Sequence, residues 1–186
     1  MMCAWVSSPH SHHLDEMIKA TYTLFDEDVC DRLDAHHLCV IADISALDLL
    51  TSLFATLQSQ GLHLRMVIGY AYDAVLKAGV MSAGEVYDHQ WVHLYQLFLH
   101  ELKHSQHHLI DALKLKMDAL DHDDRLTLKT YLDYHGNAIL ASEALYVHRN
   151  TFNYRLNKAI EHSGIDVRIH PYGLLLTLYF AYEQLR

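Results

Sequence analysis

Residues 136–160 read GNAILASEALYVHRNTFNYRLNKAI, and this stretch decides the fold of the C-terminal third of the chain. Gly136 can take the left-handed conformation that ends a helix, and Asn137 can cap the helix that follows. Apolar residues recur at helical spacing on both sides of the short segment Tyr146-Val147-His148. The pattern predicts two helices joined by a tight turn, which is the spacing of a DNA-reading helix-turn-helix.

Each of these two helices should bury one apolar face. In the first helix we expect the inward positions to be Ile139, Leu140, Ala144 and Leu145. In the second helix, which should end at Gly164, they are Phe152, Leu156, Ala159 and Ile160. A shorter helix containing Leu128, Tyr131 and Leu132 precedes both, and the acidic run Asp121-His122-Asp123-Asp124 supplies its N-cap.

The other face of the second helix carries the candidate DNA-binding residues. They are Arg149, Asn150, Thr151, Asn153, Tyr154, Asn157 and Lys158. Arginine can form two hydrogen bonds to guanine and asparagine two to adenine, so we expect Arg149, Asn150 and Asn153 to read bases. Thr151 and Lys158 are better suited to hold phosphates.

Several motifs in this region resemble those of one known family. They are Tyr131-Leu132, Gly136-Asn137, Ala144-Leu145, Val147-His148-Arg149-Asn150-Thr151-Phe152 and Tyr154-Arg155-Leu156. The region is similar to the C-terminal domain of PucR/CdaR-type transcriptional regulators, whose hallmark is V-H-R-N-T-[LF]-x-Y-R-L. The resemblance implies a Fis-like helix-turn-helix and a sequence-specific regulator that binds double-stranded DNA.

The part before residue 91 reads as a small α/β layer. Leu14 to Phe25 has helical spacing, and Leu38–Ala42 and Leu64–Tyr70 are strand-like runs on either side of a helix from Ser45 to near Gly61. A short helix from Asp73 to Ala78 and an edge strand at Glu85-Val86-Tyr87 are expected next. The stretch from Leu64 to Phe98 is similar to the family's degenerate GGDEF-like domain. It has no G-G-[DE]-E-F motif, so a nucleotide cyclase is not implied.

The sequence therefore predicts an α+β chain in which a small α/β part precedes an all-α helix-turn-helix domain. The expected divisions are a helical segment at 1–35, a partial GGDEF-like domain at 36–90, connecting helices at 91–122 and the DNA-binding domain at 123–186.

The net charge of −9 counts against a nucleic-acid partner, because phosphate contacts need cations. The acids are unevenly distributed, however, since residues 1–125 hold 18 of the 23 Asp and Glu. Residues 126–186 carry 5 acids against 6 Lys and Arg, and no acid lies between His148 and Lys158. The second helix thus has a local basic stripe.

Other features of the sequence limit the classes of protein to which the chain can belong. No run of apolar residues approaches the ~18 of a spanning helix, and three cysteines without close pairing argue against a disulfide framework. We expect a cytoplasmic protein without membrane partner, cofactor or bound metal. A homodimer is expected, because one helix-turn-helix covers few base pairs. An unidentified small-molecule effector is a further expected partner.

Two alternatives stay open. The first is a protein–protein or ligand-sensing module that keeps the helix-turn-helix fold without useful DNA affinity, which the overall acidity favours. The second and more remote one is a zinc hydrolase, because His100-Glu101-Leu102-Lys103-His104 fits H-E-x-x-H. The extended form of that motif needs glycine at position 107 and histidine at 110, where the chain has His107 and Ile110. We therefore expect no enzyme activity.

Overall fold

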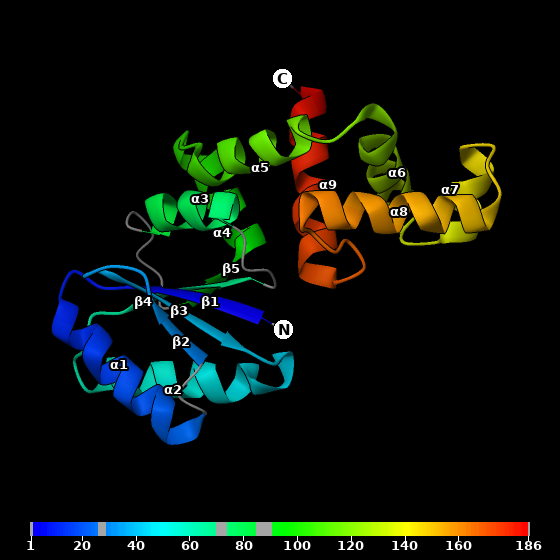
Figure 1. The fold of residues 1–186 in the computed structure, drawn as a ribbon. Coiled ribbons are helices and arrows are strands. Elements are labelled where there is room, and N and C mark those ends of the chain that lie inside the picture. Colours follow the sequence, from blue (N-terminus) through cyan, green and yellow to red (C-terminus); the bar gives the residue numbers. More distant parts are fainter. Residues whose placement is uncertain (1, 26–28, 70–73, 85–90, 186) are drawn as a thin grey trace. The chain divides into compact units, whose positions relative to one another are not determined.

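The computed structural model describes residues 2–25, 29–69, 74–84 and 91–185 of the chain. The chain divides into two compact units, Met1–Leu109 and Ile110–Arg186, and the division falls inside helix α5 (His108–Asp118). Each unit has its own helices (Figure 1), and each has its own buried residues. The expected α+β class is confirmed, with the sheet in the first unit and only helices in the described part of the second.

The described part of the first unit contains a five-stranded sheet of order β2-β3-β1-β4-β5. Its strands are β1 (Met2–Ser7), β2 (Cys30–Arg32), β3 (His37–Ala42), β4 (Arg65–Gly69) and β5 (Trp91–His93). Neighbouring strands run antiparallel except β4 and β5, which are parallel. The N-terminal strand β1 therefore lies in the middle of the sheet.

Helices cover both faces of this sheet (Figure 1). Helices α1 (Ser11–Leu24) and α2 (Leu47–Ser59) lie on one face, with the short 3-10 turn η2 (Ile44–Ala46) leading into α2. Helices α3 (Ala74–Gly84) and α4 (Leu94–His104) lie on the other. Because successive strand residues point to opposite faces, Ala4 and Val6 join the core under α1 and α2, whereas Trp5 is buried on the side of α3.

Strand β1 is the main difference from the sequence-based expectation for this unit. The helical segment expected over 1–35 does contain α1, but Met2–Ser7 pair with β3 and β4. The run Met-Cys-Ala-Trp-Val-Ser is short and buried on both faces, so it shows no alternation that would mark it as a strand. Pairing with two distant strands, and not local pattern, makes it one.

The other expected elements of this unit agree in part. The strands expected at Leu38–Ala42 and Leu64–Tyr70 are β3 and β4, although Tyr70 lies outside the described residues. The expected helix near Asp73 continues through Gly79 as α3, and the expected edge strand at Glu85-Val86-Tyr87 falls outside the described residues. The GGDEF-like interpretation of 36–90 stays a prediction.

The second unit is a helical domain. After α5 come α6 (His122–Asp133), α7 (Ala138–Ala144), α8 (Arg149–Ser163) and α9 (His170–Leu185). Its core is made by side chains from all four of these helices and the α8–α9 connection: Leu128, Ala141, Phe152, Leu156, Ala159, Ile165, Val167, Tyr172, Leu175, Leu176, Tyr179 and Phe180. Gly173 must be small here, because an added Cβ would lie 2.8 Å from the backbone oxygen of Val167.

Local signals set the ends of these helices as the sequence predicts. The Asp121 carboxylate accepts a hydrogen bond from the backbone N–H of Asp124 at the start of α6, and the Asn137 side chain accepts from the first turn of α7. Gly136 and Gly164 have φ of 80° and 67°, the left-handed values expected at helix ends.

The buried face of α7 differs from the prediction. Ile139 and Leu140 are 51% and 46% exposed, whereas Ala141 and Ser142 are buried. A helix of seven residues makes only two turns, so its sequence supports two alternative apolar faces. The small Ala141 faces the core because it permits the closest approach to the neighbouring helix.

Candidate nucleic-acid interface

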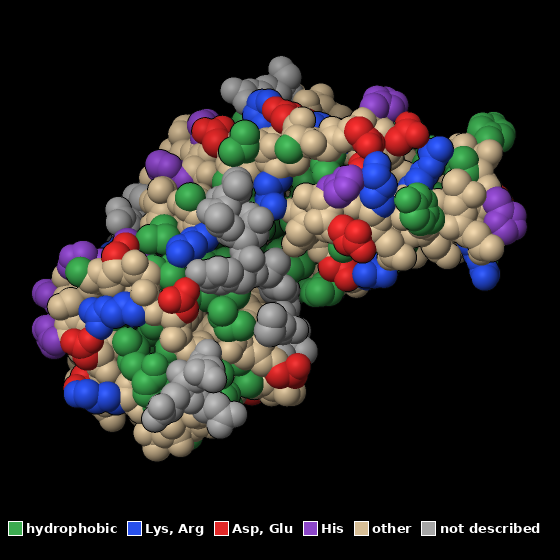
Figure 2. Space-filling view, in the orientation of Figure 1, with side chains coloured by type: hydrophobic (Ala, Val, Ile, Leu, Met, Phe, Trp, Pro, Cys, Tyr) green, Lys and Arg blue, Asp and Glu red, His purple; other side chains and the backbone are tan. Residues whose placement is uncertain are grey.

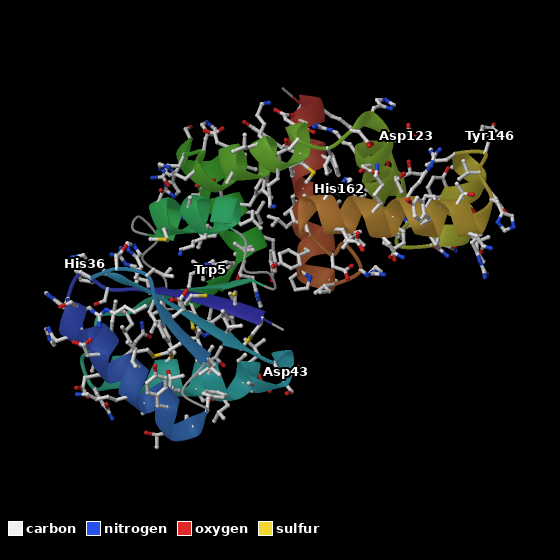
Figure 3. All side chains as sticks on the ribbon, in the orientation of Figure 1. Trp5, His36, Asp43, Asp123, Tyr146 and His162 are labelled. Carbon is white, nitrogen blue, oxygen red and sulfur yellow. The ribbon has the colours of Figure 1, made fainter. Side chains whose placement is uncertain are left out.

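A tight turn holds α7 and α8 in the predicted helix-turn-helix. Tyr146 adopts a φ of +54°. The backbone N–H of Val147 donates a hydrogen bond to the carbonyl oxygen of Ser142 at 3.0 Å. His148 is the N-cap of α8, and its Nδ1 accepts a hydrogen bond from the backbone N–H of Asn150. The Tyr146 side chain is 96% exposed at the tip of this turn (Figure 3).

The core fixes which face of α8 is presented to solvent. Phe152, Leu156 and Ala159 are fully or almost fully buried, and the Phe152 ring lies 6.5 Å from the Tyr131 ring of α6. These positions are three or four residues apart, so they form one stripe along the helix. The opposite face must therefore point outward.

Most of the predicted DNA-binding residues lie on that outward face. Arg149, Asn150, Thr151, Asn153, Tyr154 and Asn157 are exposed, and Lys158 is partly exposed. Asn157 accepts a hydrogen bond from Arg168 at 3.2 Å, and Arg168 is itself held by Asp166. Arg149 has no ion pair among the described residues, so its guanidinium is available to a partner.

The start of α6 brings three carboxylates to the second half of α8. We name Asp121, Asp123 and Asp124 the acidic cap. Lys158 Nζ lies 2.8 Å from Asp121 and 3.2 Å from Asp124, and Arg155 lies 3.3 Å from Asp123. Acidic and basic side chains accordingly lie side by side over α6 and α8 (Figure 2).

These contacts shift the pKa values of Asp121 and Lys158. The hydrogen bond from Lys158 holds the pKa of Asp121 below its usual range, and the two carboxylates raise the pKa of Lys158. Asp124 is 1% exposed and also contacts Nδ1 of His162 at 2.8 Å. Of the three cations in the basic stripe predicted from the sequence, Arg155 and Lys158 are therefore paired with acids, and Arg149 has no such pair among the described residues. The sequence identified Asp121 as a helix cap but gave no sign that the acidic cap meets residues more than thirty positions away.

The H-E-x-x-H motif lies on α4 with its glutamate turned inward. The rings of His100 and His104 are 4.3 Å apart, but Glu101 is fully buried. Both Glu101 carboxylate oxygens accept the backbone N–H of Leu109 at 2.9 Å, which ties the carboxylate to the start of α5. Among the described residues, no three His, Cys, Asp or Glu side chains are arranged to hold a metal ion. The local geometry gives Glu101 a structural role that the motif did not indicate.

A histidine cluster lies at the start of α1. It contains His10, His12, His13 and His63, and the backbone N–H of His63 donates to Nδ1 of His13 at 3.0 Å. The four rings lie within 6 Å of their neighbours.

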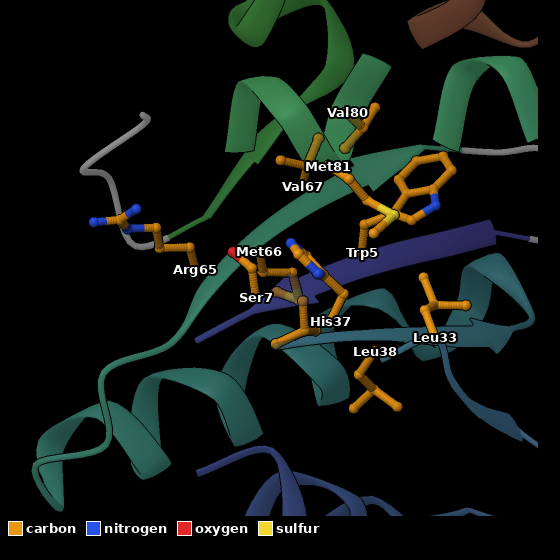
Figure 4. A pocket seen from close by; sticks show the side chains of 11 residues that line it. Trp5, Ser7, Leu33, His37, Leu38, Arg65, Met66, Val67, Val80 and Met81 are labelled. Atoms are coloured by element: carbon orange, nitrogen blue, oxygen red, sulfur yellow. The ribbon is translucent and has the colours of Figure 1, made fainter. Parts of the chain in front are cut away.

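A small apolar pocket lies on the α3 side of the sheet (Figure 4). Trp5, Leu33, His37, Val80 and Met81 are among its lining residues, and the Trp5 Nε1–H is buried without a hydrogen-bond partner among the described residues. The free volume inside is about 10 Å³, close to the space that one water molecule needs. In this conformation the pocket admits no effector-sized molecule.

Comparison with known proteins agrees with this geometry. Residues 118–182 match the family described as the PucR C-terminal helix-turn-helix domain. This segment is therefore a PucR-type helix-turn-helix domain. The matched range contains the acidic cap, the α7–α8 turn and nearly all of α9.

Two relatives extend the comparison. A protein of Bacillus subtilis (strain 168), described as the uncharacterized protein YxkF, is 39% identical over 51 residues, which are 27% of this chain and 17% of that protein. The crystal structure of a regulator of polyketide synthase expression from Bifidobacterium adolescentis covers all of this chain and 81% of its own, with a TM-score of 0.50 and 19% identity. That second likeness concerns the fold alone. None of the helices in the described residues is long and apolar enough to cross a membrane.

Proposed function

We propose that the chain is a sequence-specific DNA-binding transcriptional regulator of the PucR/CdaR type. The observation that carries the proposal is the exposed first half of α8, where Arg149 is unpaired and Asn150 and Asn153 lie beside it. The first turns of the second helix are the part of a helix-turn-helix that reaches base edges in the major groove. Arginine and asparagine there match guanine and adenine.

The remaining exposed residues of α8 suit backbone contacts. In the proposed complex Thr151 and Tyr154 offer hydroxyl groups to phosphates, and Asn157 and Lys158 extend this edge along the helix. The proposed active form is a cytoplasmic homodimer that contacts two half-sites about 10 base pairs apart or a multiple of that. Light scattering at tens of micromolar, with and without DNA, tests the dimer, and a strictly monomeric mass in both cases would exclude it.

One observation favours a second function. The acidic cap neutralises Arg155 and Lys158, and an acidic surround repels a nucleic acid. A domain with this arrangement could serve as a non-enzymatic protein–protein or ligand-sensing module that has kept the helix-turn-helix fold. The two functions differ in whether the folded chain binds duplex DNA at low salt.

Selection from random duplex DNA with the full chain distinguishes them. Asn150→Ala should weaken binding to the preferred DNA site by about 1–3 kcal/mol and relax the sequence preference at one base pair. Arg149→Ala should in addition lower the salt dependence of binding. Lys129→Ala is the matched control, since Lys129 pairs with Asp133 on α6 and lies outside α8. It should change binding little. If the folded chain selects no sequence and binds no duplex even at low salt, the interaction module replaces the DNA reader.

A further inference from the structure

The cations of the helix-turn-helix domain are almost all held by the domain's own acids. Among described residues 125–185 the paired ones are Arg125, Lys129, Arg155, Lys158 and Arg168. Arg149 is the one Lys or Arg of that stretch without such a pair. Two of the five pairs, those of Arg155 and Lys158, lie on the helix that is proposed to bind DNA.

The acidic cap occupies these two cations as phosphates would. Each carboxylate brings a negative oxygen to within 3.3 Å of a guanidinium or ammonium nitrogen. The carboxylates are also stabilised where they are, because Asp121 is the N-cap of α6 and Asp123 and Asp124 lie in its first turn, where the helix dipole favours negative charge. DNA must therefore displace them before it gains a new contact with Arg155 or Lys158.

The pairs differ in how easily they break. Asp123 is exposed and Arg155 is partly exposed, and such surface pairs contribute about 0–1 kcal/mol. Asp124 is buried, so separating Lys158 from it leaves a buried carboxylate that keeps only His162. Arg155 should be released before Lys158.

We propose that the acidic cap is an internal competitor for DNA phosphates, which weakens phosphate contact by Arg155 and Lys158 and lowers the salt dependence of DNA binding. This inference rests on the proposed DNA-binding function. Asp121, Asp123 and Asp124 are then positioning residues that act on DNA through Arg155 and Lys158.

The test compares two doubly substituted full chains with the same net charge. The cap variant is Asp121→Asn with Asp123→Asn, which leaves buried Asp124 in place and keeps a side chain able to cap α6. The control is Asp111→Asn with Asp133→Asn, two acids of the second unit for which the described residues show no hydrogen bond or ion pair with α8. Binding of the selected duplex is titrated at several salt concentrations.

Removing the Asp123 carboxylate frees Arg155, while Lys158 loses Asp121 but keeps Asp124, so the slope of log K against log salt should steepen by at least about 0.9, the value for one phosphate contact. The affinity gain on lowering salt from about 200 to about 50 mM should then be at least about threefold larger than for the wild type. The control should keep the wild-type slope. Adding Arg155→Ala to the cap variant should remove this increase, while the same change in the wild type, where Asp123 holds Arg155, should have little effect.

Asp123→Asn alone, which removes only an exposed carboxylate, should add about 0.9 to the slope and serves if the double variant folds poorly. A DNA-binding chain whose slope is unchanged in the cap variants overturns this proposal and leaves the DNA-binding function standing. An equal increase in the control also overturns it, since net charge would then be the cause. If no variant and no wild-type chain binds any duplex, both proposals fail together.

Discussion

The orientation of α8 depends on Phe152, and truncating this side chain tests that dependence. Phe152 is 0% exposed and lies against Tyr131 of α6. Phe152→Ala removes a fully buried ring, which typically costs about 3–5 kcal/mol. A domain of this size, at about 0.05–0.15 kcal/mol per residue, has roughly 4–12 kcal/mol of stability. The variant should therefore lose between about a quarter and all of it.

The matched control is Tyr154→Ala, two residues further along the same helix. Tyr154 is 71% exposed, so the loss of a similar aromatic ring there should change stability by no more than about 0.5 kcal/mol. Hydrogen exchange of the full chain, followed by mass spectrometry, measures the two effects separately for each unit. Peptides from α6 and α8 should exchange at least about 100-fold faster in Phe152→Ala, because each 1.4 kcal/mol is a factor of ten.

Peptides from β3 and β4 provide the internal reference, because they belong to the first unit. Their exchange should be similar in all three chains. Equal acceleration by both substitutions, or an effect of Phe152→Ala below about 1 kcal/mol, would refute the assignment of the buried and exposed faces of α8. The argument for which residues face DNA would then fail with it.

Three further outcomes are expected. Gly136→Ala should cost about 1–2 kcal/mol in urea unfolding, because Gly136 has φ of 80°; an unchanged midpoint would contradict this. The hydrogen bond from Lys158 lowers the pKa of Asp121 in the folded state, so its stabilisation is complete above the unfolded pKa and is lost as pH falls through the folded pKa. Acid unfolding should therefore steepen below about pH 4, and Asp121→Asn, followed by circular dichroism, should flatten it; identical acid curves would argue against the pair. Glu101→Gln should lower stability by about 1–3 kcal/mol, because the Glu101 carboxylate accepts the backbone N–H of Leu109. Protein prepared without chelator should contain no stoichiometric zinc. Bound zinc together with a peptidase activity that this variant loses would restore the hydrolase interpretation.

Some sequence-based predictions failed where a pattern was too short to choose one face. The apolar residues of the seven-residue helix α7 allowed two buried faces, and the expected one, with Ile139 and Leu140, is exposed. The six-residue run of β1 gave no alternation at all, because both faces of the central strand are buried. Longer helices such as α8 gave several repeats of one spacing, and there the buried stripe was predicted residue by residue except that Ile160 is only partly buried.

The sequence by itself determined the features that depend on neighbouring residues. Asn137 and Asp121 cap helices, and Gly136 and Gly164 end them, because these effects act within one helical turn. The helix-turn-helix and the outward polar face of α8 follow from such local signals.

Only the tertiary structure decided which charges of that face are free. The acidic cap lies more than thirty residues before Arg155 and Lys158, and nothing in the local pattern links them. Burial of Leu128 and Phe152 packs α6 against α8 and brings the carboxylates to the cations. Because Coulomb interactions depend on distance in space and not on separation in sequence, the stripe that looks basic in the sequence is open only near Arg149 in the fold.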